Sequence, residues 1–167
     1  MGLENKLIEI SLPTFNNHIY SGYCIKETSK LFILINFNPK IKSFDGFTVF
    51  KTEDIDAYRE WAKGEIGKIK KDNRKEIISL FNFNKALTFY SCLKLLIDNY
   101  LIAFFTDNNT KEYYVAKVTG LSKSHLILKL IDQNGKWLNS KAIKLSDINY
   151  FSFHTKYEEQ LNKKIRN

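Results

Sequence analysis

The most constraining feature of the sequence is the stretch from 101 to 153, where apolar runs alternate with turn-forming residues. Within 112–121 and 125–132 the apolar side chains recur at every second position, which is the period of a β-strand. Asn134-Gly135 follows them and supplies the positive φ angles that a tight hairpin turn requires. Short runs at nearly regular spacing predict a small β-barrel or sandwich. The five expected strands are 101–106, 112–121, 125–132, 142–145 and 148–153.

A weaker copy of the same pattern lies between residues 19 and 61. An alignment offset by 94 residues sets Tyr20 on Tyr114, and after a variable loop an offset of 93 sets Asp54 on Asp147. Internal repeats are tested first because they set the number of domains. This alignment predicts two small barrels that arose by duplication.

Three segments outside these runs predict helices. The charged segment 57–77 suggests a short helix near its start, followed by a loop. Segment 84–100 has helical spacing of its apolar residues, with Asn84 as a candidate N-cap. The last fourteen residues, 154–167, carry one apolar seam and predict a closing helix. The expected domains are an N-terminal barrel (1–62), a basic linker (63–84) and a C-terminal barrel with its helices (85–167).

Composition limits the function classes. The chain of 167 residues has 26 Lys and Arg against 18 Asp and Glu, a net charge of +8, which permits association with nucleic acid or an anionic surface. Its two cysteines, Cys24 and Cys92, are too few for a disulfide framework and form no CxxC pair, so we expect a reducing cytoplasm. We see no secretory signal and no apolar run of about 18 residues, so no membrane association is expected.

The residues now on the page resemble a group of uncharacterised bacterial proteins that contain an Sm-like open β-barrel. The resemblance covers residues 85–163 and, more weakly, 20–61. It rests on these positions: Ala116-Lys117-Val118, Ile131-Asp132, Gly135, Trp137, Leu145, Asp147-Ile148, Phe153, Thr155, Tyr157 and Leu161. It implies a mainly β protein with a few helices: two Sm-like small open β-barrels in tandem, joined by a helical segment and closed by a C-terminal helix.

The resemblance implies no substrate and no cofactor. Both copies lack the Arg-Gly pair of the RNA-binding Sm proteins, and the first copy also lacks their Asp and Asn within 30–37. Their uridine-binding pocket is therefore not expected in this chain.

Catalytic and metal-binding arrangements are not evident in the sequence. The histidines, His18, His125 and His154, are scattered, whereas a metal site needs several convergent ligands. The two cysteines lie in apolar runs, where a small buried side chain is expected. We expect four further residues to have structural roles in turns: Asp54, Asp147, Gly46 and Gly135. The chain is therefore not expected to be an enzyme or to hold a metal or cofactor.

The basic stretch 63–75 is the candidate nucleic-acid site. Clustered lysines and arginines neutralise phosphates and release counterions, and aromatic side chains on the strands stack on bases. The residues assigned to this site are Lys63, Lys68, Lys70, Lys71, Arg74 and Lys75, with Tyr113 and Trp137 as stacking residues. Solvated lysines are the simpler alternative reading of the same stretch.

We favour a non-enzymatic binding module, a protein–protein interaction or regulatory adaptor protein, over nucleic-acid binding. Small barrels have open strand edges that accept a partner strand. The same edges would allow a dimer, and the sequence leaves the oligomeric state and the identity of the protein partner open.

Overall fold

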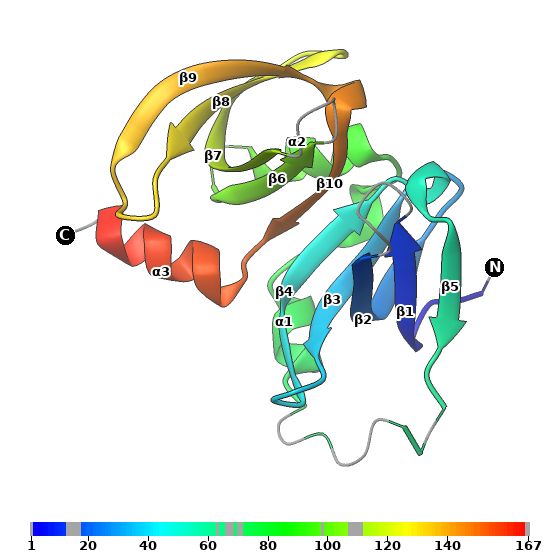
Figure 1. The fold of residues 1–167 in the computed structure, drawn as a ribbon. Coiled ribbons are helices and arrows are strands. Elements are labelled where there is room, and N and C mark those ends of the chain that lie inside the picture. The colour runs from blue at the N-terminus through cyan, green and yellow to red at the C-terminus, as the bar shows by residue number, and fades with distance from the viewer. Residues whose placement is uncertain are drawn as a thin grey trace. The chain divides into compact units, whose positions relative to one another are not determined.

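The computed structural model describes residues 2–12, 18–62, 64–65, 69, 72–97, 99–106 and 112–165, with only the backbone of His18. The chain forms two compact units, Met1–Phe89 and Tyr90–Asn167 (Figure 1). The described residues are mainly in β-strands, with three α-helices, which confirms the predicted class. The predicted linker 63–84 falls within the first unit of this division.

Five antiparallel strands form the sheet of the first unit, in the order β5-β1-β2-β3-β4. Strand β3, which lies between β2 and β4, is buried on both faces, because its apolar residues are almost continuous. The elements are β1 (Leu7–Leu12), β2 (His18–Glu27), β3 (Phe32–Asn38), β4 (Ser43–Phe50), the 3-10 helix η2 (Thr52–Asp54), β5 (Ala57–Glu60), α1 (Arg74–Ser79) and the 3-10 helix η3 (Phe83–Lys85).

The predicted start of a helix near residue 57 is wrong. Ala57–Glu60 is strand β5, which pairs with β1 from Ser11 opposite Ala57 to Ile8 opposite Glu60. Its four residues carry no clear strand signal of their own, so pairing with β1 decides their conformation.

Five antiparallel strands also form the sheet of the second unit, in the order β10-β6-β7-β8-β9. Figure 1 shows β7, β8 and β9 bending together as a curved sheet. The elements are α2 (Phe89–Leu96), which starts at the boundary, β6 (Ile102–Thr106), β7 (Glu112–Leu121), β8 (His125–Ile131), β9 (Trp137–Lys144), the 3-10 helix η4 (Leu145–Asp147), β10 (Ile148–Phe153) and α3 (Lys156–Ile165).

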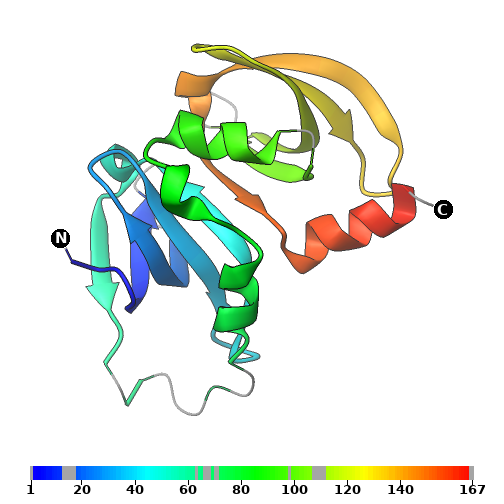
Figure 2. The same cartoon turned by 180° about the vertical axis from the view of Figure 1, so that it is seen from behind.

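The second unit contains both predicted helices, each shorter than its predicted segment. Asn84 lies in η3 and does not cap α2, which begins five residues later at Phe89. The predicted closing helix is present as α3, and Figure 2 shows it from behind. Its N-terminus is closed by Glu158, whose carboxylate accepts hydrogen bonds from the Thr155 backbone N–H (2.7 Å) and hydroxyl (2.5 Å).

Strand register is the same in the two units. In the first, Gly22 of β2 pairs with Asn36 of β3; in the second, Ala116 of β7 pairs with Leu130 of β8. The second pair lies 94 residues after the first (116 − 22 and 130 − 36), which is the offset of the sequence alignment. The ladders β1–β2 and β6–β7 correspond in the same way.

The irregularities of the two sheets also correspond. The β2–β3 ladder shifts register between Cys24 and Lys26, and the β7–β8 ladder shifts between Val118 and Gly120. Equivalent shifts occur in the ladders β3–β4 and β8–β9. In both units a 3-10 helix that ends in aspartate, Asp54 or Asp147, leads into the strand that pairs with the first one. Position-by-position comparison of the two units is therefore meaningful.

Candidate binding surface

Most of the predicted basic site lies outside the described residues, namely Lys63, Lys68, Lys70 and Lys71. Of the other two, Lys75 is exposed at the start of α1.

Arg74 is held within the first unit. Its guanidinium donates to both carboxylate oxygens of Asp72 (2.8 and 2.5 Å) and lies 4.4 Å from the ring centroid of Tyr23. The hydrogen bonds from Arg74 hold the pKa of the Asp72 carboxyl below its ordinary value. This arginine stabilises the local packing, and its charge is already paired.

The two predicted stacking residues lie on the face of the second unit that α3 covers. Trp137 packs at the edge of a buried cluster formed by Leu101, Ala103, Val115, Ile131 and Leu161. The ring of Tyr113 lies 4.5 Å from Phe105 and 6.5 Å from Tyr157 of α3, centroid to centroid. Burial raises the pKa of the Tyr113 hydroxyl. Both aromatic side chains are thus engaged in packing, although Tyr113 keeps 46% of its surface exposed.

The four predicted turn residues occupy two kinds of position. Asp54 and Asp147 end the 3-10 helices η2 and η4, and Gly135 has φ +86° in the turn between β8 and β9. Gly46 lies instead inside β4, with φ +59°, where the β3–β4 ladder shifts register. A bulge residue with positive φ favours glycine for the same reason that a turn does.

The cysteines and histidines have no common site. Cys24 and Cys92 are fully buried, and burial raises the pKa of the Cys24 thiol to about 12. His125 is exposed on β8, and His154 Nδ1 lies 3.4 Å from a carboxylate oxygen of Glu159. Within the described ranges, no three His, Cys, Asp or Glu residues are grouped so that they could hold a metal ion.

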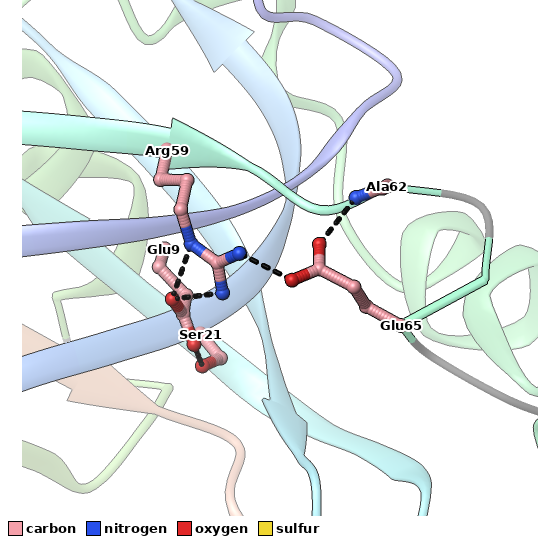
Figure 3. A network of polar contacts seen from close by, with 5 residues as sticks. All are labelled: Glu9, Ser21, Arg59, Ala62 and Glu65. Atoms are coloured by element: carbon pink, nitrogen blue, oxygen red, sulfur yellow. Dashed lines mark hydrogen bonds and ion pairs between the residues drawn. The ribbon is translucent and has the colours of Figure 1, made fainter.

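A network of polar contacts surrounds Arg59 of β5 in the first unit (Figure 3). Arg59 donates to Glu9 (2.8 and 3.1 Å) and to Glu65 (2.5 Å), and Glu65 also accepts from the Ala62 backbone N–H (2.6 Å). Ser21 donates to the other oxygen of Glu9 at 3.4 Å. These contacts pair Arg59 with two carboxylates, so its positive charge is already neutralised within the first unit.

A further surface of the second unit lies on the same face of β7, β8 and β9 as Val115 and Ile131, next to the rung that Leu161 of α3 packs against. Cross-strand partners lie on the same face of a sheet, so the register defines this surface as three successive rungs. We call it the lysine face. Its rungs are Lys117–Lys129–Ser140, Gly120–Ile127–Ala142 and His125–Lys144.

The lysine face carries three lysines and one histidine and no carboxylate. Lys117 is directly opposite Lys129, an arrangement of like charges that destabilises a sheet. Within the part of the chain that the structure describes, none of these lysines forms an ion pair. Lys141, which points to the opposite face of β9, is by contrast paired with Glu112 at 3.1 Å.

An apolar strip separates the Lys117–Lys129 rung from the His125–Lys144 rung. Ile127 is 49% exposed although it lies in the middle of β8. A Cβ added at Gly120 would lie 3.1 Å from the Ile127 side chain, so the absence of a side chain at Gly120 allows Ile127 to rest against β7. Ala142 adds a small side chain on the other flank.

The equivalent rungs of the first unit are covered and apolar. Ile35, Phe47 and Ile33 occupy the positions of Lys129, Ser140 and Ile127, and all three are fully buried. Segment 74–87 of the same unit lies over them: the ring of Phe47 is 5.5 Å from Phe81 and 5.1 Å from Phe83, and Lys26 Nζ donates to the Phe83 carbonyl. These three positions are thus buried in the first unit, whereas in the second Ile127 and Ser140 are exposed and Lys129 is partly exposed.

Sequence reasoning missed the lysine face. Lys117 and Lys129 appear in the sequence as the polar halves of two alternating strands, which is the pattern of ordinary solvated positions. Their juxtaposition depends on the β7–β8 register. The absence of acidic residues between 113 and 131 was the available signal.

Comparison with known proteins adds nothing to this geometry: no protein-family model, curated protein or solved structure matches the chain. No helix in the described segments has the length and apolar character to cross a membrane.

Proposed function

We propose that the protein is a non-enzymatic binding module that holds a protein partner on the lysine face of its second unit. The observation that carries the proposal is a set of three lysines around an exposed isoleucine, none of which forms an ion pair with a described residue. The equivalent positions of the first unit are covered by that unit's own segment 74–87. Charged residues beside an exposed apolar side chain are typical of a surface that another molecule covers.

We also propose that the two units are copies of one small open barrel of the Sm-like kind. Identical strand order, identical register and register shifts at equivalent places support this. A duplicated fold releases one copy from structural requirements, so its surface is free to acquire a partner. Covering of the equivalent positions in the first unit and exposure of the lysine face in the second fit that history.

A protein partner is favoured over a nucleic acid by the position of the aromatic residues. Binding of single strands combines a basic groove with aromatic rings on which bases stack. The three rungs of the lysine face contain no aromatic residue. Trp137 lies on the same face in the neighbouring rung, Val115–Ile131–Trp137, where it packs on the cluster that contains Leu161 of α3, and Tyr113 contacts Tyr157 of α3. Aliphatic Ile127 in their place suits a protein side chain better than a base.

A photo-crosslinking experiment tests this proposal. The residue p-benzoylphenylalanine replaces Ile127, and in a control protein it replaces the exposed Ile78 of α1 in the first unit. Both proteins are exposed to nuclease-treated extract of cells that express the natural protein, irradiated and analysed by mass spectrometry. We expect a discrete protein adduct at position 127 and none at position 78.

Two results would count against the proposal. Adducts that are the same at both positions would show that capture is non-specific. In a parallel reaction with untreated extract, nucleic-acid adducts at position 127 that are absent after nuclease treatment, with no protein adduct in either, would assign the surface to nucleic acid instead.

A further inference from the structure

We infer that the partner contributes an extended acidic segment with the pattern acidic-x-apolar-x-acidic, which lies along the strands of the lysine face. This inference rests on the proposed function and specifies the chemistry of the partner.

The charge of the lysine face requires carboxylates from the partner. Lys117 and Lys129 face one another without an acidic neighbour, and Lys144 lies opposite His125 at the other end. Since no described residue forms an ion pair with them, these lysines can donate charge-assisted hydrogen bonds to a partner. An acidic segment relieves the repulsion between Lys117 and Lys129. The binding free energy should therefore be more favourable than two isolated surface ion pairs would supply.

The spacing of the rungs sets the pattern of the segment. Lys129, Ile127 and His125 occupy alternate positions on β8 and face the same side. Alternate residues of a strand are about 7 Å apart, so the two basic rungs are separated by about 14 Å with the apolar rung between them. An extended peptide has the same rise, so carboxylates at positions i and i+4 reach both basic rungs while the residue at i+2 contacts Ile127 and Ala142.

The first unit provides the precedent for a segment that covers this face. There, segment 74–87 lies over the equivalent rungs and contributes apolar rings, Phe81 and Phe83, to a purely apolar face. In the second unit the same rungs carry lysines at the ends and an aliphatic centre. The chemistry of the covering segment changes accordingly from aromatic to acidic with an apolar centre.

The test uses the full-length protein and three labelled probes in a fluorescence anisotropy titration at low salt. The first probe is a peptide that repeats Glu-Thr-Leu-Thr-Glu; the second has glutamine for each glutamate; the third is an oligothymidylate of the same charge as the first. We expect the acidic peptide to bind and the glutamine peptide to bind at least about tenfold more weakly, since tenfold corresponds to about 1.4 kcal/mol.

Matched variants locate the site. Lys117→Gln with Lys129→Gln should weaken binding of the acidic peptide about tenfold or more, since both charges of one rung are removed. Lys85→Gln with Lys163→Gln removes the same charge from two exposed positions elsewhere and should leave the affinity within about twofold. Thermal melting followed by circular dichroism is the control that checks whether both double variants are folded.

Three outcomes separate failure of the inference from failure of the proposed function. Equal loss of affinity in the two double variants, or tighter binding of the oligothymidylate that depends on Lys117 and Lys129, overturns the acidic segment. Absence of acidic-peptide binding while position 127 still crosslinks a protein overturns the partner chemistry and leaves the binding function standing. If neither the peptide nor any protein from the extract reaches position 127, both fail.

Discussion

Replacing Lys129 by glutamate should stabilise the second unit while weakening its binding of the partner. The substitution converts the like-charge pair with Lys117 into an opposite-charge pair on neighbouring strands. Cross-strand charge pairs contribute about 0.2 to 1 kcal/mol, and like charges are unfavourable by a similar amount, so the change of sign should raise the free energy of unfolding by about 1 kcal/mol. Both side chains are partly exposed, which keeps the expected gain at that level.

Thermal and urea unfolding of four proteins measure this gain as a double-mutant cycle. The proteins are the wild type, Lys129→Glu, Lys117→Gln and the combination. For a unit of this size, 1 kcal/mol corresponds to a rise in Tm of about 4 to 8 °C. In the Lys117→Gln background most of the gain should disappear, because the partner charge is absent. The gain should also shrink in about 1 M salt, where the Debye length is about 3 Å.

One result would refute the electrostatic reasoning. If Lys129→Glu changes stability equally with and without Lys117, the two ammonium groups do not interact, and the lysine face is an ordinary solvated surface. A more stable variant that retains full affinity for the acidic peptide would likewise separate the charge pair from binding.

Further predictions concern the interior. Gly22→Ala should destabilise the first unit by about 1 to 3 kcal/mol in urea unfolding, because its Cβ would lie 2.6 Å from a carbonyl oxygen of β3. Gly64→Ala has nothing within 4 Å and should change stability little. Cys24 and Cys92 should not react with a thiol reagent near pH 8 until denaturant is added, since both are fully buried. Burial raises the pKa of Asp54, and its Oδ2 has no hydrogen-bond partner among the described residues. The folded state therefore holds this proton more tightly, and stability should fall as pH rises through the folded pKa; in Asp54→Asn this component of the pH profile should vanish.

Local sequence patterns were sufficient to predict several strands and the closing helix. Alternation of apolar residues in 112–121 and 125–132 is a property of neighbours in the chain, and β7 and β8 were found nearly where expected. The seam of Tyr157, Leu161 and Ile165 likewise predicted α3. Strand β4, read as part of a variable loop, was missed because Asp45-Gly46 interrupts its pattern with a bulge.

Elements whose conformation depends on residues far away in the chain could not be predicted from the local sequence. β5 has four exposed residues and becomes a strand only because β1 offers it a ladder. Trp137 reads as an available stacking residue until α3 is seen to cover its face of the sheet.

By itself, the sequence determined the strand periodicity, the turns and the offset that relates the two halves, since each follows from residues close together or from direct comparison of two stretches. Only the tertiary structure decided which face of each sheet is covered. Lys117 and Lys129 are twelve residues apart in the chain, and the register of β7 on β8 brings them opposite one another. Register is set by pairing and burial along whole strands, so the charge of a surface formed across strands is not encoded in any one of them.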